Sequence, residues 1–165
     1  MNASIKYGAA LVAALAMFGA AAQAAPVSSN PTIVSGGITF DTFTISVTSA
    51  GAASFPTANN QVNVNAMSTG TGITINSGFT SLGGGFSDAA ITYVARGTAA
   101  VSQVGLSFDG SFFGLAIASV TETIYSDANR LNQVGFGYIS CGAIAGCTRS
   151  VSIDLAGSYD TLYVT

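Results

Sequence analysis

The chain has 165 residues, of which 49% are hydrophobic and only 7% are charged, and its formal net charge is −3. Four basic residues against seven acidic ones leave no basic surface, which argues against nucleic-acid binding. Histidine is absent and Lys6 is the only lysine, so a Ser-His-Asp triad, a Cys-His nucleophile and a His-ligated metal are excluded. Such low charge, with 20 Gly and many Ser, Thr and Asn, is typical of a secreted or surface β protein.

The first 24 residues are predicted to be a secretory signal peptide. Lys6 supplies the positive charge, residues 8–22 form an uncharged apolar run, and Ala22-Gln23-Ala24 places small residues where a signal peptidase reads them. The apolar run is shorter than the about 20 residues that a membrane-spanning helix needs. We therefore expect cleavage after Ala24, which removes the only lysine and with it any Schiff-base chemistry, and no membrane span in the mature chain.

A hairpin centred on Asp109-Gly110 is the clearest local signal, because an Asp-Gly pair between alternating runs is typical of a type I′ turn. A two-residue loop predicts the cross-strand pairs Phe108–Ser111, Leu106–Phe113, Val104–Leu115 and Ser102–Ile117. A four-residue loop would keep the same residues on the same face. We expect the apolar members to point into the core and the other strands to be arranged around this hairpin.

Alternating apolar residues predict further strands, and Gly-rich or polar segments such as residues 126–132 separate them. The predicted strands cover residues 37–48, 62–65, 73–76, 89–96, 119–125, 134–138, 151–155 and 162–165. The apolar phase changes near Asp41-Thr42 and again around Ala118-Ser119, which predicts a β-bulge or bend at the first position and a bulge or a fresh strand at the second.

Together these segments predict an all-β fold, an antiparallel β-sandwich of jelly-roll or Ig-like type with eight to nine short strands. The predicted organisation is a signal peptide over residues 1–24, a flexible lead-in over residues 25–36, and one domain over residues 37–165. Pro26 and Pro31 are the reason for expecting the lead-in to be flexible.

Asp109, Glu122, Asp127 and Asp154 are the candidates for the two carboxylates that glycoside hydrolysis needs. The turn explains Asp109, and no spacing brings the other three together. Calcium binding through loop carboxylates and carbonyls stays open, although no Asp-x-Asp-x-Asn/Asp-Gly loop occurs. No metal or cofactor is predicted.

Glu122 differs from the other acids because it lies on the apolar phase of its strand, between Val120 and Ile124. A buried and unpaired carboxylate is costly. The sequence therefore predicts either an exposed edge or a structural ion pair with one of the three arginines, Arg96, Arg130 or Arg149. We prefer the ion pair to a catalytic role.

Phe112 and Tyr125 are candidates for an aromatic platform that binds sugars. The favoured alternative is that Phe112 covers a neighbouring strand or loop, and the chain has no Trp for such a platform. Cys141 and Cys147 are predicted to form a disulfide after export, because both lie in one short Gly-containing segment of an exported chain.

Four runs in the second half of the chain resemble a known family of exported proteins. They are Asp88-Ala89-Ala90-Ile91-Thr92-Tyr93, Gln103-Val104-Gly105-Leu106-Ser107-Phe108-Asp109-Gly110, Ala118-Ser119-Val120-Thr121-Glu122-Thr123 and Leu162-Tyr163-Val164-Thr165. The family consists of Gram-negative proteins that carry a PEP-CTERM sorting tail. The resemblance implies a β-sandwich ectodomain, processing by an exosortase and a link to exopolysaccharide and biofilm, and no catalytic residues transfer with it.

The Pro-Glu-Pro motif, hydrophobic helix and basic cluster of that tail do not occur before Thr165. We therefore expect the chain to be truncated after Thr165, or else not to be sorted in this way. The resulting expectation is a non-enzymatic exported protein of the cell surface, outer envelope or extracellular matrix, with extracellular polysaccharide or other matrix proteins as partners. A carbohydrate-binding module is the first alternative, and a carboxylate-dependent glycosidase is the second.

Overall fold

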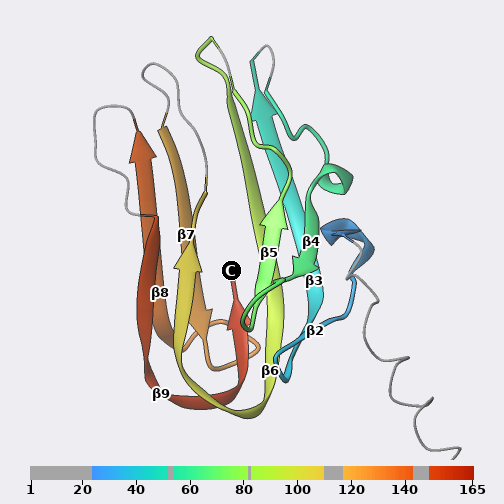
Figure 1. The fold of residues 1–165 in the computed structure, drawn as a ribbon. Helices are drawn as coiled ribbons and strands as arrows, with labels where there is room; N and C mark the ends of the chain where they lie inside the picture. Colours follow the sequence, from blue (N-terminus) through green and yellow to red (C-terminus); the bar gives the residue numbers. More distant parts are fainter. Residues whose placement is uncertain (1–23, 52–53, 82, 110–116, 143–148) are drawn as a thin grey trace, which may run out of the picture.

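A computed structural model describes residues 24–51, 54–81, 83–109, 117–142 and 149–165, and these residues form two antiparallel β-sheets (Figure 1). The smaller sheet has the strand order β1-β4-β5, and the larger has the order β2-β3-β6-β9-β7-β8. The strands are β1 (Ala25–Pro26), β2 (Ile33–Ser35), β3 (Ile38–Ala50), β4 (Asn63–Ala66), β5 (Ile73–Asn76), β6 (Phe86–Ser107), β7 (Ile117–Tyr125), β8 (Gln133–Gly142) and β9 (Ser150–Val164). The predicted all-β sandwich is confirmed. No helix in the described ranges has the length and apolar character needed to cross a membrane.

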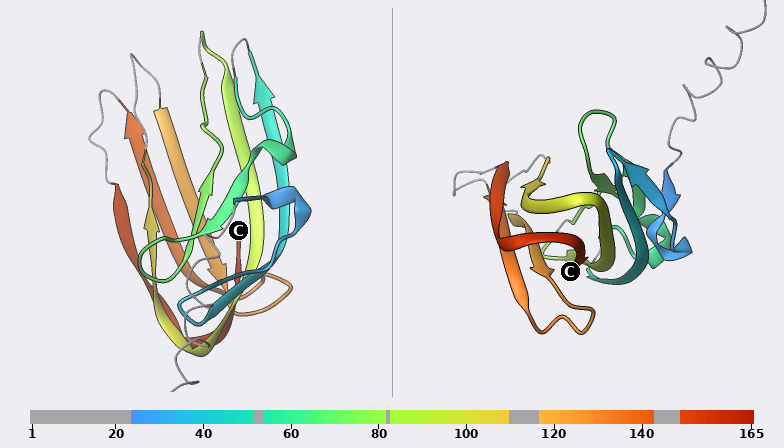
Figure 2. Two further views of the ribbon diagram at one scale, coloured as in Figure 1. Left: turned by 45° about the vertical axis from the view of Figure 1, so that its right-hand side comes forward. Right: turned by 90° about the horizontal axis from the view of Figure 1, so that it is seen from below.

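Strands β6 and β9 run through both layers of the sandwich. They comprise 22 and 15 residues, so each joins two segments that the sequence predicted as separate strands. Residues 93–96 of β6 pair with residues 161–164 of β9, residues 103–107 pair with residues 150–154, and the register shifts between these two stretches. The two strands curve together at this point, as the view from below in Figure 2 shows. The curve carries one end of each strand over β7 and β8.

The predicted hairpin is not formed as expected. Ser102–Ile117 is the one predicted pair that lies wholly within the described residues, and Ile117 pairs instead with Gly142. In the sheet, β9 lies between β6 and β7. The other three predicted pairs involve residues 111–115, which lie outside the described residues. Turn residues and alternation indicate that a chain reverses, but they do not specify which strand becomes its neighbour, and here β9 alternates equally well.

The predicted bulge in β3 is confirmed. The register with β6 shifts between Asp41 and Thr44, and Thr42 has a positive φ of 56°. This extra residue restores the phase, so Phe40 and Phe43 are both buried. The Asn30 side-chain oxygen accepts a hydrogen bond from the backbone N–H of Phe43 at 2.6 Å, which satisfies a donor that the bulge removes from the ladder. The second predicted change of phase, around Ala118-Ser119, is not accompanied by a bulge, because the register of β7 (Ile117–Tyr125) with β8 is regular from Ile117 to Ile124.

Residues 25–36 form β1, the 3₁₀ helix η1 (Val27–Ser29) and β2 in place of the flexible lead-in that was predicted. Strand β1 pairs with β4, and β2 pairs with β3. Val27 is 0% exposed, and its backbone N–H bonds to the carbonyl of Val62 at 2.8 Å. The burial of Val27, together with the pairing of β1 and β2, therefore holds this segment on the sandwich.

Two hydrophobic clusters lie on the same face of the larger sheet. The first cluster lies where β4 and β5 cover β3 and the first part of β6 (Figure 1). Its buried members are Val27, Phe40, Phe43, Val62 and Val64. The second cluster lies where the curved ends of β6 and β9 cover β7 and β8. Its buried members are Ile124, Val134, Ile153, Leu162 and Val164. Tyr93 and Ala95 pack against both clusters, so the centre of β6 joins the two halves of the core.

Candidate functional site

Strand β8 places glycines inside the sandwich and aromatic residues outside. Gly135 and Gly137 are buried, whereas Phe136 and Tyr138 are 54% and 53% exposed. A Cβ atom added to Gly137 would lie 2.5 Å from Cδ1 of Ile153, which belongs to the opposite layer. That separation is too short for any side chain without movement of Ile153. Glycine at positions 135 and 137 therefore accommodates the close approach of β9, while Ile139 and Cys141 occupy the inner face further along the strand.

The outer side of β7, β8 and the end of β9 forms a surface that we call the aromatic face. Alternation and register place twelve residues there: Ile117, Ser119, Thr121, Thr123, Tyr125, Gln133, Phe136, Tyr138, Ser140, Thr161, Tyr163 and Thr165. None of these side chains is charged. Thr123 and Thr121 lie opposite Phe136 and Tyr138 in the β7–β8 register. The surface thus combines two well-exposed rings with hydroxyl groups.

Tyr125, one member of the predicted sugar platform, lies on the aromatic face and pairs in register with Tyr163. The other member, Phe112, lies outside the described residues. Phe136 and Tyr138 were not predicted as site residues, because aromatic residues that alternate in a strand normally indicate a core face. The available signal was the identity of the intervening residues, since a strand glycine often marks the close approach of another backbone or side chain.

Glu122 lies inside the sandwich, as its apolar phase indicates, and is only 9% exposed. Its Oε1 accepts a hydrogen bond of 2.8 Å from the Tyr93 hydroxyl, while Oε2 is buried with no hydrogen-bond partner among the described residues. The partner is therefore a tyrosine and not one of the three arginines. Arg96 instead forms an ion pair with Asp41, which is the single ion pair within the described ranges.

This environment shifts the pKa values of both members of the pair. Burial raises the pKa of Glu122, and the hydrogen bond from Tyr93 offsets only part of that effect. Burial also raises the pKa of Tyr93 well above its ordinary value of 10.0, and the charge and hydrogen bond of Glu122 act in the same direction. The pair joins β6 to β7 beneath the aromatic face, and its enclosure separates the carboxyl group from any polymer bound outside.

The other candidate acids lie in separate places. Asp109 follows β6 and is exposed. The Asp127 carboxylate accepts backbone hydrogen bonds within the β7–β8 loop, including one of 2.7 Å from Asn132. Asp154 accepts a hydrogen bond of 2.7 Å from the Gln103 amide. Across the described part of the chain, no group of three or more His, Cys, Asp or Glu lies close enough to hold a metal ion.

Cys141 lies on the inner face of β8 and is 0% exposed. Cys147 lies outside the described residues. The disulfide between them therefore stays a prediction.

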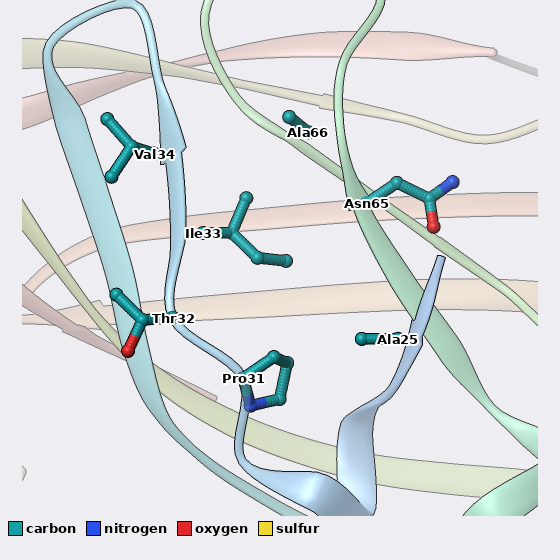
Figure 3. Close-up of a pocket in the computed structure, with 7 residues that line it drawn as sticks. All are labelled: Ala25, Pro31, Thr32, Ile33, Val34, Asn65 and Ala66. Carbon is teal, nitrogen blue, oxygen red and sulfur yellow. The ribbon is translucent and has the colours of Figure 1, made fainter. Parts of the chain in front are cut away.

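A pocket of about 260 Å³ lies where β1, β2 and β4 meet (Figure 3). It is lined by Ala25, Pro31, Thr32, Ile33, Val34, Asn65 and Ala66. The Asn65 side-chain oxygen is buried without a hydrogen-bond partner in the described ranges. With one free acceptor and no charged lining residue, the pocket offers a weak recognition site and no reactive group.

Three features thus stand out: the aromatic face, the Glu122–Tyr93 pair and the small pocket. The pair is enclosed, and the polar side chains of the pocket are limited to Thr32 and Asn65. The aromatic face is exposed, extends over three strands and is built on regular secondary structure. No protein-family model matches this chain, and no curated protein or solved structure matches it either.

Proposed function

We propose that this protein is an exported, non-enzymatic protein of the cell envelope or extracellular matrix that works in association with extracellular polysaccharide. The observation that carries the proposal is the position of β1. This strand begins at Ala25, the residue that becomes N-terminal when the predicted signal peptide is removed. Ala25 pairs with Val64, and Pro26 pairs with Asn63, so the first residues of the predicted mature chain belong to the smaller sheet.

The placement of the acids supports a structural role for them. Glu122 is enclosed and bonded to Tyr93, and Asp127 closes a tight loop through backbone N–H groups. A retaining or inverting glycosidase needs two carboxyl groups about 5 to 10 Å apart on either side of an accessible sugar. A carbohydrate-binding module is the alternative that a specific observation favours, because the aromatic face presents uncharged rings and hydroxyls on one surface.

Expression of the full chain in a Gram-negative host, followed by fractionation and intact-mass measurement, tests the proposal. We expect the protein outside the cytoplasm with a mass that begins at Ala25. Ala24→Tyr is the matched control, because a bulky residue at this position blocks signal peptidase while leaving β1 unchanged. A cytoplasmic protein that retains Met1, or equal processing of the control, would overturn the export proposal.

A further inference from the structure

We propose that the aromatic face of β7, β8 and β9 is a binding site for an uncharged polysaccharide chain, with Phe136 and Tyr138 as its stacking residues. The inference deepens the proposed function, since it assigns the ligand class and the surface. It rests on four observations, namely the orientation of β8, the absence of charge, the spacing of the rings and the size of the aromatic face.

The orientation of β8 runs against simple burial of apolar side chains. Phe136 and Tyr138 are half exposed, while the residues beside them on the inner face are Gly135 and Gly137. Glycine in a strand adds no packing of its own and increases the entropy lost on folding. The strand therefore presents two aromatic rings to solvent on a segment with regular pairing to β7, which holds them in place before any ligand arrives.

The absence of charge selects the kind of polymer. The twelve side chains of the aromatic face include no Asp, Glu, Lys or Arg. Arg96 lies opposite Thr161 at the border of the face, but its charge is paired with that of Asp41. The surface therefore offers little net electrostatic attraction to an anionic or cationic chain. Thr121 and Thr123 lie beside the two rings, and their hydroxyls both donate and accept hydrogen bonds. Apolar rings with neighbouring hydroxyls complement a sugar, which has apolar C–H faces and hydroxyls around its rim.

The spacing of the rings suits consecutive units of a chain. Phe136 and Tyr138 are two residues apart on one strand, which separates their Cα atoms by about 7 Å. The β7–β8 register shifts between Ile124 and Tyr125, so Tyr125 lies opposite Gln133, beyond the regular part of the pair. The interval between Phe136 and Tyr138 is on the scale of consecutive sugar units, and Tyr125 lies past the shift on the same side of the sheet.

The aromatic face is smaller than the surface that a stable dimer uses. It comprises twelve residues, whereas a standard protein interface takes about 20–30 residues from each partner. A small patch suits a polymer instead, because a polysaccharide presents many equivalent units and several protein copies bind along it.

The test is co-sedimentation and affinity electrophoresis of the full, processed chain with four neutral polymers, namely cellulose, amylose, dextran and galactomannan, and with the anionic polymer alginate. We expect binding to at least one neutral polymer, no binding to alginate, and an affinity that changes less than twofold between about 50 mM and 500 mM NaCl. The double variant Phe136→Ser/Tyr138→Ser should lose at least tenfold in affinity.

Phe79→Ser is the matched control, because Phe79 is 47% exposed and follows β5, away from the aromatic face. It should bind within twofold of the wild type, and unchanged far-ultraviolet circular dichroism should show that both variants fold.

The inference is overturned if no neutral polymer binds, if alginate binds more tightly, or if the double variant binds as the wild type does. It is also overturned if the wild type is a dimer by sedimentation and the double variant a monomer without any polymer binding, because the face is then an interface between copies. These results are independent of export, since the binding assays use purified protein.

Discussion

Replacement of Gly137 by alanine tests the arrangement on which the aromatic face depends. The added Cβ would lie 2.5 Å from Cδ1 and 3.0 Å from Cγ1 of Ile153, and 3.3 Å from Cδ2 of Leu106. Because the methyl group enters a packed interior between two layers, we expect Gly137→Ala to lower the free energy of unfolding by about 1–3 kcal/mol. A one-residue change in the facing of β8 cannot relieve this clash, because it would turn the larger Phe136 and Tyr138 side chains inward.

Gly105→Ala provides the matched control. Gly105 lies in β6, and a Cβ atom added there would have no neighbour within 4 Å. Its replacement should leave stability unchanged or raise it by up to about 1 kcal/mol, because alanine restricts the unfolded chain more than glycine does. The control separates the packing effect from the general effect of replacing glycine in a strand.

Ile153→Val provides a rescue, because it removes the Cδ1 atom that the new methyl group would meet. Alone it should cost about 0.5–1.5 kcal/mol. Combined with Gly137→Ala, the total loss should be smaller than the sum of the single losses by about 1 kcal/mol. Denaturant unfolding followed by far-ultraviolet circular dichroism measures all four proteins. Strict additivity, or equal stabilities for the alanine variants at positions 105 and 137, would refute the proposed packing of β9 on β8.

Three further predictions concern polar groups. Burial raises the folded-state pKa of Glu122, so the folded protein binds the proton more tightly than the unfolded chain, and stability should fall as pH rises through that pKa. Glu122→Gln should flatten this dependence in unfolding measurements from about pH 4 to pH 8, whereas parallel curves would contradict it. Arg96→Ala should cost less than about 1 kcal/mol, because its partly exposed ion pair with Asp41 is screened by water, and the loss should shrink further in 1 M NaCl. Backbone hydrogen bonds, of which the one from Asn132 is the strongest, lower the pKa of Asp127, so the stability that its carboxylate contributes is lost as pH falls through the folded-state pKa. Asp127→Ala should remove this contribution. An acid unfolding midpoint that is the same for the variant and the wild type would argue against it.

Local features of the fold were predictable because they depend on residues close in sequence. The change of apolar phase at Asp41-Thr42 required an inserted residue, and the structure has a bulge there with Thr42 at positive φ. Alternation over residues 73–76 predicted β5 at its observed bounds. In both cases a period of two fixes which side chains share a face, whatever the partner strand is.

Strand neighbours were not predictable in the same way. The Asp109-Gly110 signal was strong, yet β6 lies beside β9, and Ile117 pairs with Gly142. Nothing within a few residues of β6 identifies a partner about 50 residues later in the chain. Val27 raises a similar point, because a lone valine between prolines gives no periodic signal, and only the buried position against Val62 reveals its role.

The same distinction applies to the candidate site. The inward direction of Glu122 followed from its strand phase, but its partner Tyr93 lies 29 residues away on another strand. An arginine was the expected partner because it neutralises a buried carboxylate most simply. A tyrosine hydroxyl also serves, since burial raises the carboxyl pKa and so favours the neutral form, which needs no opposite charge.

Core packing and the proposed binding surface have one structural cause. The curve in β6 and β9 brings Ile153 against Gly137 and Leu155 against Gly135, which leaves little room for a side chain at these two positions of β8. The aromatic residues between and beside them face outward, where the β7–β8 ladder orders them. A site built on a paired strand loses little conformational freedom on binding. Loss of the Ile153 contact should therefore loosen the aromatic face without any change to its own residues, which links the stability of the second core cluster to the affinity for polysaccharide.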